Sequence, residues 1–357
     1  MTDSRSPGTF TSLGEHSHEQ VSFFYEPSTG YRGIIAIHDT TLGPALGGTR
    51  FWNYTSDQAA FTDALRLSRG MTYKAAVAGL NLGGGKSVII GDNKTTNREA
   101  LFRVHGRHVE SLGGRYITAE DVGTSTADME FIRSETTHVT GLLGKSGDPS
   151  PVTAYGTYHG MKAAAKHRWG SDSLSGKTVA LQGCGHVGYY LCKHLHEEGA
   201  KLIVTDIDAQ RVKTVTQDFG ATAVGTEEIF SQNADIFAPC ALGAVINDET
   251  IPKFKVAIVA GAANNVLAED RHGDELEKKG IVYAPDYVIN GGGLINVNAE
   301  LHDWSLERAR AKAGEIYDTI LRVFEIASEE KIPSYRAADR LAEQRIAAVA
   351  KVRQNFV

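Results

Sequence analysis

The sequence predicts an α/β protein of two domains, a mixed α/β domain followed by a doubly wound parallel sheet. A chain of 357 residues is longer than one hydrophobic core usually fills. Beyond residue 153, short apolar runs alternate with helix-patterned segments, as in a parallel sheet. Between the two patterns lies GLLGKSGDPSP, residues 141–151, which is dense in Gly, Pro and Ser. We therefore predict a first domain over 1–145, a second over 146–333, and a C-terminal helix over 334–357 that returns to the first domain.

Apolar periodicity, and the residues that interrupt it, predict the elements of the first domain. Two apolar-rich strands surround the turn residues Pro27 to Gly30, which predicts a hairpin. Ser56 is the expected N-cap of a long helix. In chain order we expect the hairpin over 20–38, a loop over 41–50, a helix over 56–76, a glycine turn over 83–85, a strand over 87–90, a helix over 97–111, a strand over 115–119 and a helix over 125–135.

The second domain is predicted to open with a helix over 153–169 that Gly170 ends. Its strands and helices then alternate in the order of a doubly wound sheet. We expect strands over 177–182, 201–206, 234–238, 256–261 and 281–285, a helix over 185–199, and two amphipathic helices over 310–330 and 335–353, separated at Pro333.

Composition and charge exclude several classes of function. Apolar residues make up 41% of the chain and charged residues 22%, as in an ordinary globular protein. The net charge of −6 and the lack of a basic run argue against nucleic-acid binding. The first 20 residues are too polar for a signal peptide, and no apolar run is long enough for a membrane span, so we expect a cytoplasmic protein. Three cysteines without a Cys-x-x-Cys pair predict free thiols and no metal site, and His16 and His18 are expected to be solvated in a mobile tail.

The stretch LNLGGGKSVII, residues 80–90, has the Gly-Lys-Ser of a phosphate-binding loop. Such a loop also needs a Gly five residues before the Gly that precedes Lys-Ser, and a helix after it. Leu80 occupies that position, and the residues after Lys86 form an apolar β-branched run. The sequence therefore excludes an ATPase site and leaves open why a lysine lies among glycines.

A Rossmann-type dinucleotide site is predicted by LQGCGHVGYY, which has the Gly-x-Gly-x-x-Gly pattern between a predicted strand and a predicted helix. The three glycines allow a tight turn, the approach of a pyrophosphate, and close packing of helix on strand. The residues expected to contact the cofactor here are Gly183, Cys184, Gly185, His186, Val187 and Gly188.

Asp206 ends the next predicted strand, where such sites carry an acidic residue. Its carboxylate would accept hydrogen bonds from a ribose diol and repel a 2′-phosphate, so NAD is favoured over NADP. Arg211 lies nearby and weakens that preference.

The first domain must supply the reacting groups, and it offers Lys74, Lys86, Glu120 and Asp121. A lysine buried between glycines and an apolar strand loses hydration, which lowers its pKa toward the range of a general base. A second cation at Lys74 would act in the same direction. Surface charges are the alternative for all of these residues, but the setting of Lys86 favours catalysis.

Five segments in order resemble one family: IAIHDTTLGPALGGTR, LNLGGGKSVIIGD, GRYITAEDVGT, DIFAPCALG and YAPDYVIN. They are similar to segments of the glutamate/leucine/phenylalanine/valine dehydrogenases, most closely the leucine enzymes. The likeness runs from about residue 19 to the C-terminus. It implies NAD-dependent, reversible oxidative deamination of branched-chain L-amino acids to 2-oxo acids and ammonia. It also implies a homo-oligomer, an octamer, with the active site in a cleft between the domains.

The resemblance also implies roles for individual residues. Lys74 would hold the substrate carboxylate, Lys86 would activate the water that attacks the imine, and Asp121 would relay protons to and from the amino group. Cofactor contacts are implied at Thr153, Cys240, Ala241, Leu242 and Asn290, and at Asn264 or Asn265, between which the sequence does not choose. For Thr153, an N-cap role is the alternative.

Substrate preference is predicted from one position above all. Leu46 stands where the glutamate-specific relatives carry a lysine, and without that partner a buried distal carboxylate is strongly disfavoured. Ala119-Glu120-Asp121 matches the leucine enzymes better than the phenylalanine enzymes. The expected substrate pocket contains Leu46, Gly47, Gly48, Met71, Ala119, Val288 and Leu294, although the apolar members fit plain core equally well. Two alternatives stay open: a phenylalanine or broad-range aliphatic amino acid dehydrogenase, and an inactive NAD-binding regulatory protein.

Overall fold

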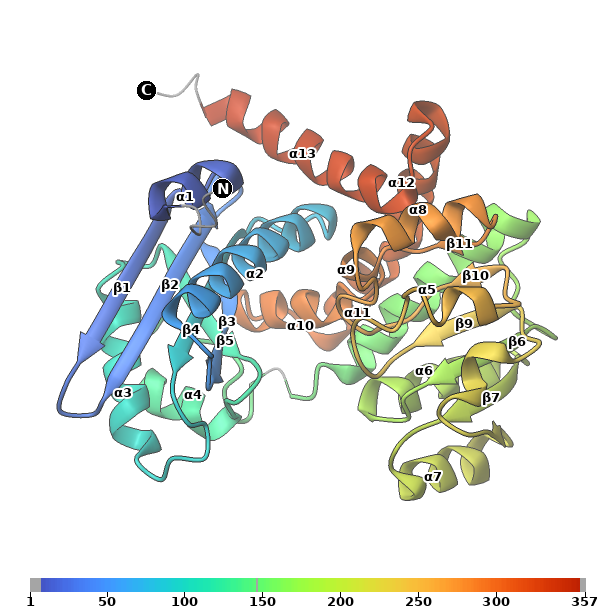
Figure 1. Cartoon of the computed structure of the whole chain (residues 1–357), viewed down its shortest axis with the longest axis horizontal. Helices are drawn as coiled ribbons and strands as arrows, with labels where there is room; N and C mark the ends of the chain where they lie inside the picture. Colours follow the sequence, from blue (N-terminus) through green and yellow to red (C-terminus); the bar gives the residue numbers. More distant parts are fainter. Residues whose placement is uncertain (1–7, 146, 354–357) are drawn as a thin grey trace, which may run out of the picture. The chain divides into compact units, whose positions relative to one another are not determined.

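The chain forms two compact α/β units in the computed structural model, which describes residues 8–145 and 147–353 (Figure 1). The first unit contains the residues up to Gly147 together with those from Glu343 onward, and the second runs from Asp148 to Ala342. Among the described residues, no helix is both long enough and apolar enough to cross a membrane.

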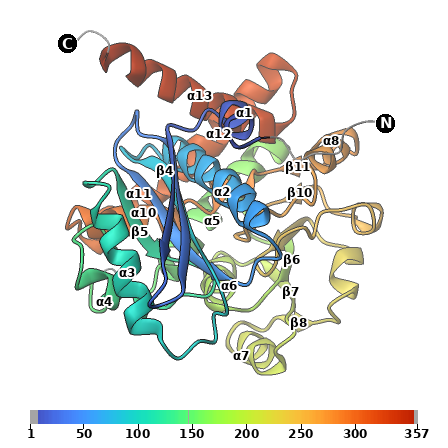
Figure 2. The ribbon, with the colours of Figure 1, turned by 60° about the vertical axis from the view of Figure 1, so that its left-hand side comes forward.

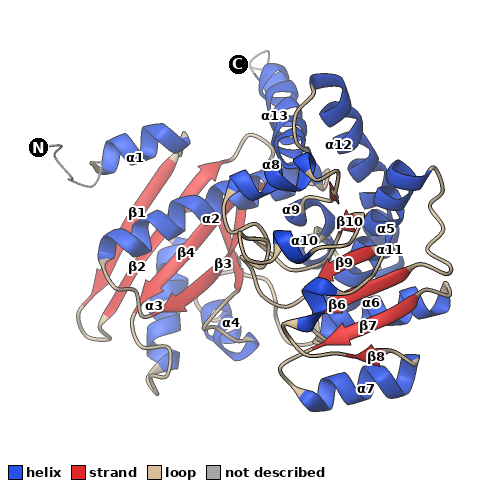
Figure 3. Cartoon of the chain, turned by 45° about the vertical axis from the view of Figure 1, so that its right-hand side comes forward, coloured by secondary structure: helices blue, strands red, loops and turns tan. Residues whose placement is uncertain are grey.

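A five-stranded mixed sheet forms the centre of the first unit, in the order β1-β2-β4-β3-β5 (Figure 3). The neighbours β1 (Gln20–Glu26), β2 (Tyr31–Asp39) and β4 (Gly83–Ile90) are antiparallel. β3 (Ala45–Trp52) lies parallel between β4 and β5 (Tyr116–Glu120). The hairpin predicted over 20–38 is confirmed, and the three parallel strands place functional candidates side by side.

Helices cover both faces of this sheet (Figure 2). The side chains of β2 alternate between the faces, as the period of a strand requires. Ile34 joins a buried cluster with α2 (Asp57–Val77), whereas Ile35 joins one with Val109 of α3 (Arg98–Glu110). The sheet therefore separates two apolar layers, which fixes its strands in one register.

The predicted helix starts hold in this unit. Ser56 caps α2, because its side chain accepts a hydrogen bond from the Ala59 N–H. At α4 (Thr126–Arg133), Ser125 and Asp128 form a reciprocal capping box.

The N-terminal segment differs from the predicted solvated tail. A helix, α1 (Thr9–His16), occupies part of it. The Nε2 atom of His18 lies 2.8 Å from Ser68 Oγ and 3.2 Å from the Leu65 carbonyl, both on α2. The prediction for His18 is therefore wrong, because a tertiary contact on α2 anchors its ring. The side chain of His16 lies outside the described residues.

Two predicted connections in the first unit are strands. The loop expected over 41–50 is largely β3, and the glycine turn expected over 83–85 is the beginning of β4. The glycines serve close packing and not a turn: a Cβ on Gly84 would lie 2.1 Å from Thr72 N, and one on Gly47 would lie 1.7 Å from the Gly85 carbonyl oxygen. Glycine adds no side chain to a periodic pattern, so the alternation that identifies a strand was hidden.

The second unit is built on a six-stranded parallel sheet in the order β11-β10-β9-β6-β7-β8. This confirms the predicted doubly wound α/β class, although several strands are shorter than expected. The strands are β6 (Thr178–Gln182), β7 (Lys201–Thr205), β8 (Thr222–Ala223), β9 (Ile236–Pro239), β10 (Ile258–Val259) and β11 (Val282–Tyr283).

Helices connect these strands. The first, α5, ends at Gly170 in a left-handed conformation with φ of 75°, as predicted. The helices are α5 (Ser150–Trp169), α6 (His186–Glu197), α7 (Ala209–Phe219), α8 (Asp270–Lys278), α9 (Asp286–Ile289), α10 (Gly292–Leu301), α11 (Leu306–Gly314) and α12 (Ile316–Glu330), with short 3₁₀ turns at Glu228–Ser231 and Ile251–Lys253. The single helix expected over 310–330 is divided between α11 and α12 at Glu315.

The C-terminal helix α13 (Ser334–Arg353) begins in the second unit and ends in the first. In its second half, Arg345 donates to the carbonyl oxygens of Ala76 at 3.2 Å and Leu80 at 2.7 Å. It also donates to Asn81 Oδ1 at 3.0 Å. Ala76 lies in the last turn of α2, where its carbonyl oxygen also accepts from the Gly79 N–H at 3.1 Å, and Leu80 and Asn81 follow that helix. Arg345 therefore donates to acceptors at and just beyond the helix end.

Candidate functional site

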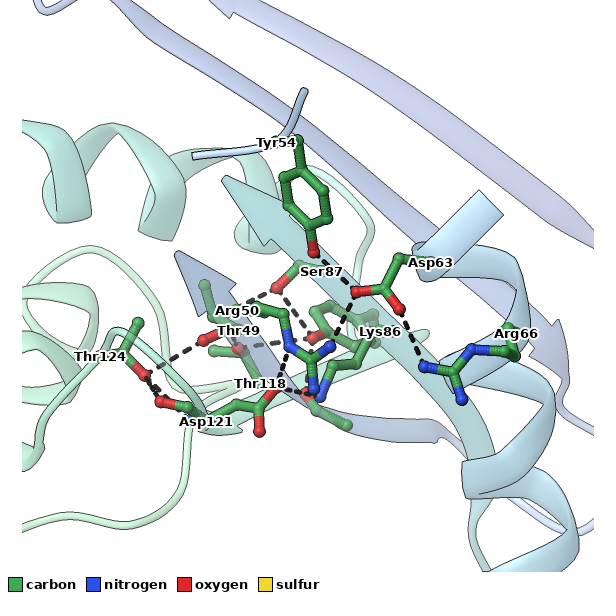
Figure 4. A network of polar contacts seen from close by, with 12 residues as sticks. Thr49, Arg50, Tyr54, Asp63, Arg66, Lys86, Ser87, Thr118, Asp121 and Thr124 are labelled. Carbon is green, nitrogen blue, oxygen red and sulfur yellow. Dashed lines mark hydrogen bonds and ion pairs between the residues drawn. The ribbon is translucent and has the colours of Figure 1, made fainter. Parts of the chain in front are cut away.

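Lys86 and Asp121 meet across three parallel strands of the first unit (Figure 4). In the register, Thr49 of β3 pairs with Ser87 of β4 on one side and with Glu120 of β5 on the other. Lys86 precedes Ser87 and Asp121 follows Glu120, so the two side chains converge. The Lys86 Nζ atom lies 2.6 Å from Asp121 Oδ2.

Burial controls the electrostatics of this pair. Lys86 is only 5% exposed, and the resulting loss of hydration lowers its pKa against the opposing effect of Asp121. Burial acts to raise the pKa of Asp121, but Lys86 and then Arg50 reverse this, so the pKa of that carboxyl lies below its ordinary value. The arrangement holds an anion beside an amine that gives up its proton more easily than a free lysine.

A charged chain continues from the pair and was missed by the sequence analysis. Arg50 Nε donates to Asp121 Oδ2 at 3.2 Å, and its Nη1 donates to Asp63 Oδ2 at 2.8 Å. The Tyr54 hydroxyl donates to the same Asp63 oxygen at 2.7 Å (Figure 4). The available signal was the arginine two residues after the Gly-Gly pair of β3, on a strand that was predicted as a loop.

A buried polar cluster behind the pair was also missed. Thr49 Oγ1 lies 2.7 Å from Ser87 Oγ, 2.5 Å from Thr118 Oγ1 and 2.9 Å from His105 Nε2. His105 is fully buried, and burial lowers its pKa to about 3, so its ring is neutral at ordinary pH. The Tyr31 hydroxyl lies 2.8 Å from His105 Nδ1. These bonds join β3, β4, β5 and α3 next to the candidate catalytic pair.

The other predicted residues of the first unit surround these strands. Lys74 lies in the last turn of α2 and is half-buried. Leu46 is 2% exposed and pairs in register with Gly84, and Ala119 pairs with Gly48 and is nearly buried. The predicted residues with their places are Leu46, Gly47 and Gly48 on β3, Met71 and Lys74 on α2, and Ala119 on β5.

Val288 and Leu294 belong to the second unit, on α9 and α10. They are 2% and 6% exposed. Both are core residues of that unit, in line with the plain-core alternative.

The glycine loop of the second unit has the geometry that its pattern predicts. Gly183 follows β6 with φ of +100°, a value that residues other than glycine rarely adopt. A Cβ on Gly188 would lie 2.0 Å from the Gly183 carbonyl oxygen, so only glycine permits this approach of helix to strand. Beside Gly185 the nearest atom to such a Cβ is Arg211 Nη1 at 3.7 Å, which leaves room for a ligand. Helix α6 begins directly after it, at His186, with its N–H groups toward the loop.

A cavity of about 370 Å³ opens beside this loop. Asp206 lies on its wall, where its Oδ2 accepts a hydrogen bond from the Cys184 N–H at 2.7 Å. The predicted cofactor residues that line the cavity are Gly183, Gly185, Asp206, Cys240, Ala241 and Leu242. A second cavity, of about 310 Å³, contains Cys184, His186 and Arg211. Val187 is the second residue of α6, and it is half-buried.

Ile207, Thr226 and Glu227 also line the larger cavity and were not predicted. Ile207 is 95% exposed and Leu242, which lines the same cavity, is 73% exposed, so apolar side chains are open to a ligand there. The position of Ile207 directly after Asp206 is the signal from which a place in the cofactor site could have been predicted. Arg211, which weakened the preference for NAD, forms an ion pair with Asp208 at 3.3 Å.

Asn290 and Asn264 are joined in the second unit. The Asn290 Nδ2 atom donates to Asn264 Oδ1 at 2.8 Å, and Asn290 is 3% exposed. The buried Asn290 Oδ1 atom has no hydrogen-bond partner among the described residues, so it can accept from a ligand amide. Asn265 adopts a left-handed backbone with φ of 51°.

Thr153 lies inside α5, and its hydroxyl donates to the Pro149 carbonyl at 2.9 Å. The N-cap role considered for Thr153 is therefore wrong, because the helix starts three residues earlier at Ser150.

Three cysteines and one cluster of acidic residues with a histidine lie in the second unit. Cys184, Cys192 and Cys240 are free thiols, as predicted. Asp248, His272 and Glu275 lie close enough to hold a metal ion. Arg271, however, already contacts both Asp248 oxygens, at 2.7 and 2.6 Å.

Comparisons with known proteins agree with the geometry. Residues 18–138 match the Glu/Leu/Phe/Val dehydrogenase dimerisation domain, and 144–210 with 203–354 match the Glutamate/Leucine/Phenylalanine/Valine dehydrogenase domain. The chain is 58% identical over 351 residues to a leucine dehydrogenase of Bacillus subtilis (strain 168), covering 98% of this chain and 96% of that protein. It is 49% identical over 336 residues to a valine dehydrogenase of Streptomyces albus, covering 92% of each. The crystal structure of L-tryptophan dehydrogenase from Nostoc punctiforme superimposes with a TM-score of 0.88 at 49% identity, covering 96% of this chain and 99% of that one.

Proposed function

Because the chain belongs to the Glu/Leu/Phe/Val dehydrogenase family and is an amino acid dehydrogenase, we propose that its substrates are branched-chain L-amino acids. Leucine, valine and isoleucine undergo oxidative deamination to 2-oxo acids and ammonia, and the reaction is reversible. The single observation that carries the proposal is the buried Lys86–Asp121 pair, with Nζ and Oδ2 2.6 Å apart. An amine with a lowered pKa beside a carboxylate suits a reaction that moves protons to and from water and an amino group.

Each group of the site has one proposed task. Lys74 stays cationic and binds the substrate carboxylate. Lys86 takes a proton from the water that attacks the imine carbon. Asp121 exchanges protons with the substrate amino group. The glycines beside Lys86 let neighbouring backbone and ring atoms pack against β4, which buries the amine and so lowers its pKa.

The proposed cofactor is NAD, bound at the glycine loop of the second unit. Bound there, NAD would supply the acceptor for the hydride that leaves the substrate Cα. The family uses NAD or NADP, and Asp206 supports NAD because its carboxylate repels a 2′-phosphate. Arg211 is paired with Asp208, which reduces its capacity to attract that phosphate. A comparison of kcat/KM for NAD and NADP tests this: NAD is expected to be at least about tenfold better.

Preference for an aliphatic side chain rests on Leu46. It is buried and offers no charge to a distal carboxylate, so glutamate is disfavoured. The leucine and valine dehydrogenases among the relatives support aliphatic substrates. The tryptophan dehydrogenase of similar fold keeps an aromatic substrate as the second candidate.

We also propose a homo-oligomer, with an octamer as the expected size. Strand β1 lies at one edge of the first sheet, so its outer backbone groups face away from β2. Phe23 and Tyr25 on this strand are 60% and 70% exposed. An edge strand with exposed aromatic side chains suits pairing with a second copy. Light scattering on the purified protein tests the size.

The assay that tests the proposed function compares NADH formation with L-leucine, L-valine, L-phenylalanine, L-tryptophan and L-glutamate. Leucine or valine is expected to give the highest kcat/KM. If phenylalanine or tryptophan exceeds both by about tenfold or more, the aliphatic assignment is wrong and the aromatic one holds.

A further inference from the structure

We propose that Arg50 is a positioning residue of this enzyme, which holds the Asp121 carboxylate against Lys86 and is itself held by Asp63 and Tyr54. This inference rests on the proposed function of the Lys86–Asp121 pair. It adds to that pair a cation that does not itself react.

The geometry of Asp121 shows why the position of Arg50 matters. Asp121 Oδ2 lies 2.6 Å from Lys86 Nζ and 3.2 Å from Arg50 Nε, so two cations share one oxygen (Figure 4). Three strands supply the three groups: β3 carries Arg50, β4 carries Lys86, and Asp121 follows β5. A carboxylate held from two sides has less freedom to turn away from the lysine, which is the precision that proton transfer needs.

Arg50 is anchored at its other end. Its Nη1 donates to Asp63 Oδ2 at 2.8 Å, and that oxygen also accepts from the Tyr54 hydroxyl at 2.7 Å. Arg66 donates to Asp63 Oδ1 at 3.0 Å, so both carboxylate oxygens of Asp63 are bound. The side chains of Arg50 and Asp63 are only 22% and 16% exposed, so this is not one of the solvent-exposed ion pairs that add little.

Charge gives Arg50 a second effect on the pair. Its positive charge opposes protonation of Lys86 and favours ionised Asp121. The charged and titratable groups around the pair are Arg50 on β3, Tyr54 after it, Asp63 and Arg66 on α2, and Tyr116 on β5. Of these, Asp63 acts on Lys86 in the opposite direction to Arg50. Removal of the arginine charge is therefore expected to raise the pKa values of both Lys86 and Asp121.

The test measures kcat for leucine oxidation against pH in the full-length protein, in the wild type and in Arg50→Gln and Arg50→Lys. In Arg50→Gln the acid limb, the low-pH side of the curve of kcat against pH, is expected to shift up by about one pH unit. On that limb kcat is then roughly tenfold lower than in the wild type. Arg50→Lys keeps the charge and is expected to restore the position of the limb while kcat stays below wild type, because one ammonium group does not reproduce the separate Nε and Nη1 donors that reach Asp121 and Asp63. Arg32→Gln, on an exposed ion pair with Asp57, is the matched control and is expected to leave the profile unchanged.

A second readout separates this proposal from the proposed function. Acetylation of Lys86 by acetic anhydride, followed by mass spectrometry over a range of pH, reports the pKa of that amine without turnover. If the wild type oxidises no amino acid, the proposed function fails while the labelling still tests Arg50. A higher pKa of Lys86 in Arg50→Gln supports the proposal. An acid limb and a labelling profile that both stay at the wild-type pH overturn it, even if the variant is less stable.

Discussion

At the scale of single residues, the site depends on what burial does to charge. Lys86 and His105 are both buried, and both have lowered pKa values, but the two side chains have different roles. The amine of Lys86 keeps an anionic neighbour and can titrate, whereas His105 is surrounded by hydroxyl groups and stays neutral. One position is therefore suited to proton transfer and the other to holding strands together.

Leu46 offers the most direct test of substrate choice. In Leu46→Lys, a cation at this buried position is expected to raise the ratio of kcat/KM for glutamate over leucine by about tenfold or more, because the distal carboxylate gains a partner. Leu46→Met keeps an apolar side chain of similar size and is the control. Steady-state kinetics with both amino acids measures the ratio. A glutamate-to-leucine ratio in Leu46→Lys equal to that in Leu46→Met would refute the role of this residue.

His105 predicts a pH dependence of stability. Its pKa is lowered from 6.5 to about 3 in the folded protein, so the unfolded chain binds a proton first as the pH falls. The stabilisation is fully present above pH 6.5 and is lost progressively toward pH 3, by about 1.4 kcal/mol per pH unit. Urea unfolding of wild type and His105→Gln between pH 7 and 5 is expected to show a difference in stability that shrinks by about 2 kcal/mol. A constant difference would contradict a neutral buried ring.

At the scale of elements, the three glycines of β4 explain why a lysine follows a run of glycines. Each lies where a neighbouring backbone or ring comes close, and β4 contacts α2 at Gly84. The glycines thus place Lys86 in the middle of a tightly packed sheet, and no phosphate loop is formed.

Gly84→Ala tests this packing. Its Cβ would lie 2.1 Å from Thr72 N in α2, a backbone atom that cannot move without shifting the helix that carries Lys74. We expect a loss of at least about 2 kcal/mol in stability together with a lower kcat/KM. Gly70→Ala is the control, because a Cβ there meets no atom within 4 Å. If the two variants unfold at the same urea concentration, the packing role of Gly84 is refuted.

The sequence was sufficient to predict an element where its apolar side chains recur with the period of a helix or a strand. The hairpin of β1 and β2, the long helix after Ser56 and the βα alternation of the second unit all follow from such periods. It failed at β3 and at the start of β4, because glycines there leave no alternating side chains to recognise. Arg50 and His105 were missed for another reason: their partners lie on other elements, and only the strand order brings them together.

At the scale of the whole molecule, helix α13 is shared between the two units. It is continuous from Ser334 to Arg353, while the boundary between the units falls at Ala342 and Glu343. Arg345 fixes its second half to the end of α2 through Leu80 and Asn81. Arg345 thus attaches the part of α13 that belongs to the first unit to the helix that carries Lys74.

Arg345→Met therefore has a predicted effect on stability. The variant keeps the apolar stem and removes the guanidinium, so the Leu80 carbonyl oxygen and Asn81 Oδ1 lose this donor, whereas the Ala76 carbonyl keeps its bond from the Gly79 N–H. We expect a loss of about 1–3 kcal/mol, measured by urea unfolding. Arg340→Met, at an exposed ion pair with Glu330 on the same helix, is the control. Equal midpoints for the two variants would show that α13 is not anchored by this arginine.

The central claim is that Lys86 is the group that takes a proton from water, and one measurement tests it most directly. Aminoethylation of the cysteine in Lys86→Cys gives a side chain that differs from lysine only by a sulfur in place of one methylene. The sulfur makes the amine less basic. The wild type, treated in the same way, controls for reaction at Cys184, Cys192 and Cys240. The account predicts that activity, lost in Lys86→Cys, returns after aminoethylation with the acid limb of the pH profile displaced to lower pH. Recovered activity with an acid limb at the wild-type position would contradict it, because the titrating group would then be another residue.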